Sequence, residues 1–145
     1  MVIVATATPD MKAASTASYT ATKIGANNAF SFDMDSACSG FLFGMSTAAS
    51  FIESGRYKKV LLIGADKMSS IVNYEDRATC IIFGDGAGAT LFEPNEEGLG
   101  MRDEYLRTDG NGREFLQATY GGSSNPITHE VLERGGHYAF QEGKT

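Results

Sequence analysis

The sequence predicts a single α/β domain whose central strands run parallel. Lys59–Asp66 is a nearly continuous apolar run, typical of a strand buried on both faces of a parallel sheet. Ala29–Met34 alternates apolar and polar residues and is a second predicted strand. Ser39–Ser54, which lies between them, has the length and composition of a helix. The order strand, helix, strand favours a right-handed parallel crossover.

Composition limits the class of protein. The chain has 145 residues, 42% of them apolar, which is enough for one ordinary core. The net charge of −6 and the lack of a basic run longer than Arg56–Lys59 argue against a nucleic-acid surface. No apolar stretch is long enough to span a membrane, and no secretory signal is recognisable, so the cytoplasm is the expected compartment. Cys38 and Cys80 lack zinc-type spacing, so we expect neither a disulfide nor a metal site.

The first predicted strand is Val2–Ala5, and its place at the very start suggests that the protein begins further upstream. Thr6–Ala14 is a predicted loop. The helix Thr16–Ile24 follows, with Ser15 as its N-cap and Gly25 at its end.

The helix Ser39–Ser54 is apolar or small on every side and ends at Gly55. A helix without a polar face is buried, so we expect it to lie between two sheets.

The second half of the chain is less regular. Thr79–Phe83 and Ala89–Phe92 are predicted strands of a hairpin that turns at Gly84–Gly88. Leu99–Leu106 is a possible edge strand, and the chain is then irregular through Gly136. We therefore expect an α/β core over residues 1–92 and an irregular inserted segment over residues 93–145.

Cys38 lies in the turn Asp35–Phe41, between a predicted strand and a predicted helix. At a helix N-terminus, unpaired N–H groups and the helix dipole favour a thiolate, which is the form that acts as a nucleophile. A free cysteine is more commonly a small buried apolar residue. Spacing alone leaves both interpretations open.

Two segments carry a resemblance to a known family. Asp33–Phe41 and Ile82–Ala89 resemble the corresponding motifs of β-ketoacyl-acyl carrier protein synthase III, a condensing enzyme of the thiolase fold. The resemblance implies a thiolase-like layered α/β fold of two similar halves. It covers the whole chain but only the middle of a family member, so the first strands and the C-terminal half are expected to be missing.

The resemblance also implies a site. Cys38 would be the nucleophile and supply an oxyanion N–H, Arg77 would contact the nucleotide end of coenzyme A, and Gly143 would line the substrate tunnel. Four residues of the glycine-rich segment would shape the neighbourhood of the cysteine: Gly84, Asp85, Gly86 and Gly88. That segment lacks the Lys-Ser/Thr of a phosphate-binding loop.

The implied reaction is the first condensation of type II fatty-acid synthesis. Cys38 would take the acetyl group of acetyl-CoA and pass it to malonyl-acyl carrier protein with decarboxylation, in a homodimer that uses the coenzyme A thioester as substrate and no cofactor. The family's catalytic histidine and asparagine match no residue here, because the chain ends at Phe140–Thr145. His129 and His137 are expected to be solvent-exposed.

Two alternatives stay open. Lys12–Ser15 departs from the family's usual loop, which leaves a secondary-metabolite ketosynthase of the same superfamily as one alternative. The other is a truncated remnant without catalytic activity.

Overall fold

The computed structural model describes residues 1–143, so Lys144 and Thr145 of the predicted Phe140–Thr145 segment lie outside the described residues. The chain forms two compact units. Unit 1 comprises residues 1–66 and 86–106, and unit 2 comprises residues 67–85 together with the chain from residue 107 onward.

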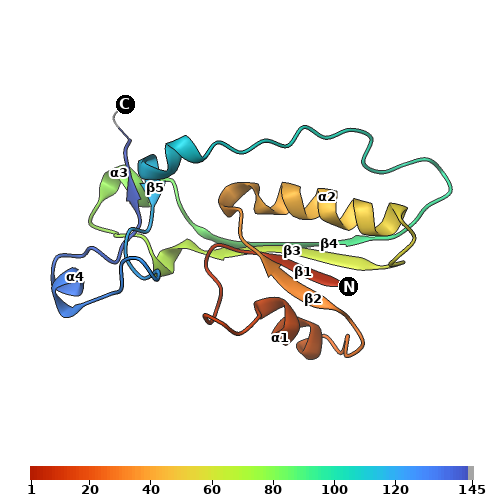
Figure 1. Ribbon diagram of the computed structural model, residues 1–145, viewed down its shortest axis with the longest axis horizontal. Coiled ribbons are helices and arrows are strands. Elements are labelled where there is room, and N and C mark those ends of the chain that lie inside the picture. Colours follow the sequence, from red (N-terminus) through yellow and green to blue (C-terminus); the bar gives the residue numbers. More distant parts are fainter. Residues whose placement is uncertain (144–145) are drawn as a thin grey trace. The chain divides into compact units, whose positions relative to one another are not determined.

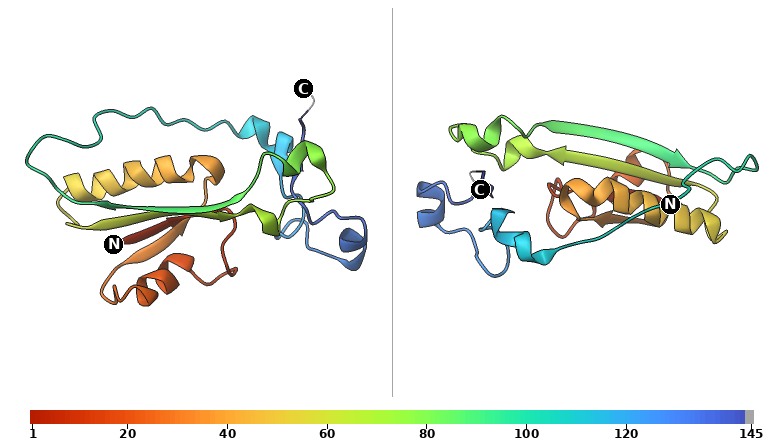
Figure 2. Two further views of the ribbon diagram at one scale, coloured as in Figure 1. Left: turned by 180° about the vertical axis from the view of Figure 1, so that it is seen from behind. Right: turned by 90° about the horizontal axis from the view of Figure 1, so that it is seen from above.

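Unit 1 is built on a four-stranded sheet of order β2-β1-β3-β4. The strands are β1 (Val2–Ala5), β2 (Ser31–Met34), β3 (Val60–Lys67) and β4 (Asp85–Phe92). β1 pairs in parallel with both β2 and β3, which places Ala5 opposite Met34 and Gly64. The arrows of β3 and β4 run in opposite directions (Figure 2). The predicted parallel pairing is confirmed, and it brings the carboxyl ends of three strands to one edge.

Two helices cover opposite faces of this sheet, α1 (Thr16–Lys23) on one and α2 (Gly40–Glu53) on the other (Figure 1). Successive side chains of a strand point to opposite faces. Val2 and Val4 accordingly pack with α1, whereas Ile3 packs with α2 and with Leu62 of β3. β1 is therefore buried on both faces, as its apolar sequence predicts.

The start of α1 is held by two side chains. Ser15 is the N-cap, and its side chain accepts the N–H of Ser18. The Asp33 carboxylate accepts the N–H groups of Thr16 and Ala17, with N···O distances of 2.8 and 2.6 Å. Asp33 lies on β2, so this carboxylate fixes the helix to the strand that leads to Cys38.

One face of α2 lies directly on the sheet because its residues there are small. A Cβ atom added to Gly44 would lie 2.5 Å from Cδ1 of Leu62. The prediction that α2 is buried on all sides is wrong within the described residues, since Leu42 on its outer side is 58% exposed. A single sheet can cover only one side of a helix that is apolar all round.

The predicted hairpin is also wrong. Residues 77–80 form the short helix α3 (Arg77–Cys80), and the glycine-rich segment enters β4 rather than making a turn. Asp76 caps α3, because its carboxylate accepts from the N–H of Ala78 and the hydroxyl of Thr79. This cap outweighs the strand propensity of the following branched residues.

Residues 93–106 have no regular structure and run alongside α2 (Figure 1), so the predicted edge strand Leu99–Leu106 is wrong. The Asn95 side chain closes a turn here, accepting the N–H groups of Glu97 and Leu99 and donating to the Leu99 carbonyl. This segment and the end of α2 line a hollow of about 370 Å³.

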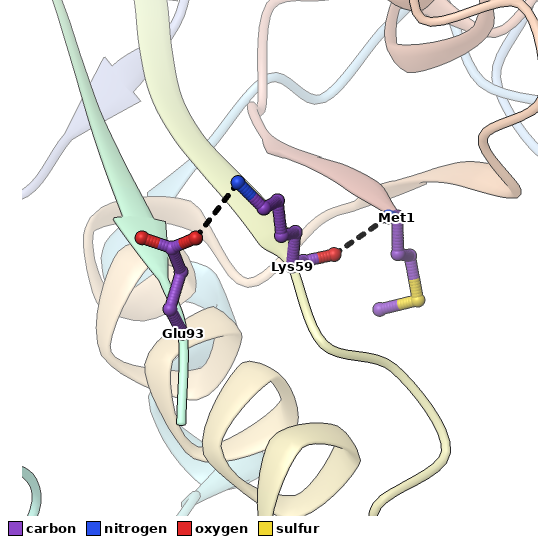
Figure 3. A network of polar contacts seen from close by, with 3 residues as sticks. All are labelled: Met1, Lys59 and Glu93. Carbon is purple, nitrogen blue, oxygen red and sulfur yellow. Dashed lines mark hydrogen bonds and ion pairs between the residues drawn. The ribbon is translucent and has the colours of Figure 1, made fainter. Parts of the chain in front are cut away.

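A small polar network lies at the amino ends of β1 and β3 (Figure 3). The amino group of Met1 donates to the Lys59 carbonyl at 2.8 Å, and Lys59 Nζ lies 2.9 Å from Glu93 Oε1. Burial lowers the pKa of the Met1 amino group. The ion pair is exposed, so it contributes little to stability.

Unit 2 consists of short elements. These are η2 (Met68–Ser70), α3, η3 (Gly110–Phe115), β5 (Leu116–Gln117), α4 (His129–Glu133) and β6 (Phe140–Gln141). β5 and β6 pair antiparallel, with Leu116 opposite Gln141.

Candidate active site

Cys38 lies at the middle of the single turn η1 (Ala37–Ser39), between the end of β2 and the start of α2. Its side chain is exposed. The prediction that this cysteine stands at or next to a helix N-terminus is confirmed. The first turn of a helix carries N–H groups without partners inside the helix, and these groups favour negative charge.

The backbone of this turn adopts a conformation that is uncommon for its residues. Ala37 has a φ of +46°, in the left-handed region. Its N–H donates to Asp35 Oδ1 at 3.2 Å. The Ser39 N–H donates to the Ser36 carbonyl at 3.1 Å, and the Gly40 N–H donates to the Ala37 carbonyl.

Small residues seat this end of α2 against the carboxyl edge of the sheet. A Cβ atom on Gly40 would lie 3.3 Å from Cβ of Ala5, and one on Gly64 would lie 3.0 Å from the ring of Phe41. The helix start therefore approaches β1 and β3 closely, which determines where Cys38 emerges.

Asp66, at the end of β3, organises the chain that leaves β1. Its Oδ1 accepts from the hydroxyls of Thr6 and Thr8 and from the N–H of Ala7, at 3.2, 2.9 and 2.9 Å. The Thr6 hydroxyl in turn accepts the N–H of Thr8 at 3.0 Å. Sequence reasoning missed this contact, although a carboxylate near the carboxyl end of a buried parallel strand was a visible signal.

A hollow of about 390 Å³ opens beside the Cys38 turn. It is lined by Thr6, Pro9, residues 11–15 and residues 33–35, and Cys38 is not among its lining residues. Ala13 in its wall has a φ of +68°. The loop that departs from the family pattern therefore forms one side of this hollow.

The other predicted site residues lie on different elements. In unit 2, Arg77 is the exposed first residue of α3, and Gly143 is exposed after β6. Gly84 precedes β4, and Gly86 and Gly88 lie on it. A Cβ atom at any of these four glycines would meet nothing within 4 Å. Their roles at the site stay predictions.

Asp85 has a clear structural partner in unit 2. Its two carboxylate oxygens accept the N–H and the hydroxyl of Ser69, at 2.7 and 2.6 Å. These hydrogen bonds lower the pKa of Asp85 from its usual 3.8. The Ser69 hydroxyl has the larger effect, its N–H the smaller, and the charge of Lys67 lowers the pKa further. Asp85 therefore anchors η2, a role that its place in a glycine-rich motif does not indicate.

We expect Ser69→Ala to raise the pKa of Asp85 towards 3.8, because the mutation removes the hydroxyl donor. A carboxylate with a lowered pKa stabilises the folded state above its unfolded-state pKa, and this stability is lost as the pH falls through the folded-state pKa. Carbon-13 NMR titration of Asp85 measures the shift. Ser70→Ala is the matched control, since the Ser70 hydroxyl donates to the Lys67 carbonyl instead. Equal shifts in both variants would contradict the assignment.

The two histidines differ. His129 is exposed, as predicted. His137 is only partly exposed, which corrects the prediction for that residue. Its ring lies 4.0 Å from that of Tyr138, and its Nδ1 atom is buried without a hydrogen-bond partner. Aromatic packing therefore accounts for its position.

Among residues 1–143, no group of three or more His, Cys, Asp or Glu side chains is arranged to hold a metal ion. Within the same range, no helix is long and apolar enough to cross a bilayer.

Comparison with known proteins identifies the family. The sequence model described as 3-oxoacyl-[acyl-carrier-protein (ACP)] synthase III matches residues 32–110, which include Cys38, Arg77 and the glycine-rich segment. The chain belongs to this family. The predicted resemblance is thereby confirmed.

Relatives within the synthase III family match along the whole chain. The β-ketoacyl-[acyl-carrier-protein] synthase III 2 of Bacteroides thetaiotaomicron is 57% identical over 145 residues, which are 100% of this chain and 43% of the relative. The corresponding protein of Phocaeicola vulgatus is 55% identical over 144 residues, which are 99% of this chain and 43% of the relative. The chain thus spans less than half the length of these synthase III relatives.

A solved 3-oxoacyl-(acyl-carrier-protein) synthase III superposes with a TM-score of 0.89 at 27% identity, covering 98% of this chain and 45% of the other. The synthase III of Thermus thermophilus gives a TM-score of 0.83 at 31% identity, covering 99% of this chain and 43% of the other. The predicted partial thiolase-like fold is confirmed.

Proposed function

We propose that this chain provides the acyl-accepting cysteine of a β-ketoacyl-acyl carrier protein synthase III, the enzyme that initiates type II fatty-acid synthesis. The observation that carries the proposal is the position of Cys38. It is exposed in η1, directly after the left-handed Ala37 and before α2, within the segment that matches the synthase III family.

The first step is transfer of the acetyl group. The Cys38 sulfur attacks the thioester carbonyl of acetyl-CoA, and the backbone N–H of Cys38 stabilises the oxyanion that forms. The new bond joins Cys38 Sγ to the acetyl carbon, and the bond to the coenzyme A sulfur breaks. The proton of the Cys38 thiol ends on the released coenzyme A.

Substrate binding involves two further residues in this proposal. Arg77 pairs with the phosphates at the nucleotide end of coenzyme A, for which an exposed planar guanidinium is suited. Gly143 lines the tunnel that admits the pantetheine arm.

The second step requires malonyl-acyl carrier protein as the partner. Its decarboxylation yields the carbanion that takes the acetyl group from Cys38. The histidine and asparagine that support this step in the family match no residue of this chain, so the proposal for these 145 residues ends at the acetyl-cysteine. We further propose that the parent enzyme is a homodimer in the cytoplasm, which rests on family membership alone.

Incubation with acetyl-CoA followed by intact-mass measurement tests the proposal. We expect the mass of one added acetyl group, located on Cys38 by peptide mapping. The Cys80→Ser variant controls for the second free cysteine and should be acetylated as fast as the unmodified chain. A chain that gains no acetyl group, or gains it only on Cys80, overturns the proposal.

A further inference from the structure

We propose that Asp35 is a positioning residue for Cys38, because its carboxylate holds Ala37 in the left-handed conformation from which the chain enters α2. The proposal rests on the proposed function in one respect, namely that Cys38 is the nucleophile. It adds a residue to which neither the family motif nor the comparisons assign a role.

Ala37 needs such support. Its φ of +46° brings Cβ close to the carbonyl oxygen, so the left-handed region is disfavoured for alanine and is visited readily only by glycine, asparagine and aspartate. A residue in this conformation persists only when its surroundings hold it there, and such residues cluster at functional sites. Cys38 is the next residue, so the conformation of Ala37 sets the direction of its side chain.

The Asp35 side chain provides one hold. Its Oδ1 accepts the Ala37 N–H at 3.2 Å, which is the local contact by which Asp and Asn side chains stabilise turns. Its backbone is anchored as well. Asp35 follows Met34, which lies opposite Ala5 in the sheet and whose carbonyl accepts the Thr6 N–H at 3.0 Å.

The start of α2 provides the other fixed point. Gly40 is buried against Ala5, and its N–H donates to the Ala37 carbonyl. The turn therefore joins two residues, Met34 and Gly40, that are both held against Ala5 at the end of β1. If Ala37 relaxed to a negative φ, residues 37–39 would have to change path between them, and the position of Cys38 relative to the start of α2 would change.

A set of variants at two positions separates this role from others. Asp35→Ala removes the acceptor, whereas Asp35→Asn keeps an acceptor oxygen and removes the charge. Ala37→Gly removes the steric penalty of the left-handed conformation, so a chain with this substitution depends less on Asp35. The double variant Asp35→Ala/Ala37→Gly tests that dependence directly.

Two rates are measured on each full 145-residue variant: acetylation of Cys38 by acetyl-CoA, and alkylation of Cys38 and Cys80 by iodoacetamide. We expect Asp35→Ala to slow both reactions of Cys38 by about five- to tenfold, the effect of losing one hydrogen bond. Asp35→Asn should stay within about twofold of the unmodified chain, and the double variant within about twofold of Ala37→Gly alone. Alkylation of Cys80, in unit 2, should not change, whereas general unfolding would accelerate it.

Three results would overturn the proposal: unchanged Cys38 rates in Asp35→Ala, an equal loss in Asp35→Asn, or no recovery in the double variant. If Asp35→Ala unfolds the chain, Asp35→Asn and the double variant still decide the question. Absence of acetylation in every variant, with alkylation following the expected series, rejects the proposed function and keeps the role of Asp35. Acetylation of Cys38 at the same rate whatever residue stands at position 35 keeps the proposed function and rejects the role of Asp35.

Discussion

Cys38→Ser is expected to slow acetyl transfer from acetyl-CoA to this chain by about 10² to 10⁴-fold, the contribution of a general base that serine needs and a thiolate does not. A hydroxyl attacks a thioester only when a neighbouring base removes its proton. Unit 1, which holds Cys38, contains no histidine in residues 1–66 or 86–106. The serine would thus keep the position of the nucleophile and lose its reactivity.

Intact-mass measurement over time gives the rate, and Cys80→Ser is the control because it leaves Cys38 in place. The stability of Cys38→Ser should change by less than about 0.5 kcal/mol, since the side chain is exposed. Acetylation of the Cys38→Ser variant at the original rate would show that another nucleophile takes the acetyl group.

The parallel core could be predicted because its signal is contained in short segments. The apolar runs at Val2–Ala5 and Lys59–Asp66 and the caps at Ser15 and Gly25 each agree with the structure within one or two residues. The prediction of a strand at Thr79–Phe83 was wrong because local hydrogen bonds to the Asp76 carboxylate stabilise a helical turn where the side chains favour a strand.

The candidate site was predicted in part, because one of its signals also lies within a short segment. Cys38 was recognised from its place between a strand and a helix. The left-handed conformation of Ala37 has no sequence signal, because alanine rarely adopts it and only the folded surroundings impose it. The contact of Asp66 with Thr6 joins residues 60 positions apart, and a single sequence does not show which strands are neighbours.

Leu62→Ala is expected to lower the free energy of unfolding by about 2–5 kcal/mol. Leu62 is fully buried between β1 and α2, so the mutation removes apolar contacts and leaves a cavity. Chemical denaturation followed by circular dichroism measures the change. Leu91→Ala is the matched control, because Leu91 lies in the same sheet but is 52% exposed, and it should cost less than about 0.5 kcal/mol. Equal costs would contradict the burial of Leu62 beneath α2.

The same contact predicts a coupling with the helix. Gly44→Ala alone forces a Cβ atom to 2.5 Å from Leu62, an overpacking that costs about 1–3 kcal/mol against a gain of about 0.5–1 kcal/mol in helix propensity. In the Leu62→Ala chain the space is free, so the same substitution should stabilise. A double-mutant cycle should therefore give an interaction energy of at least about 1 kcal/mol, and additive effects would contradict the contact. Because residue 44 lies one turn after Gly40, its size sets how closely α2 approaches β3 and, with it, where Cys38 emerges.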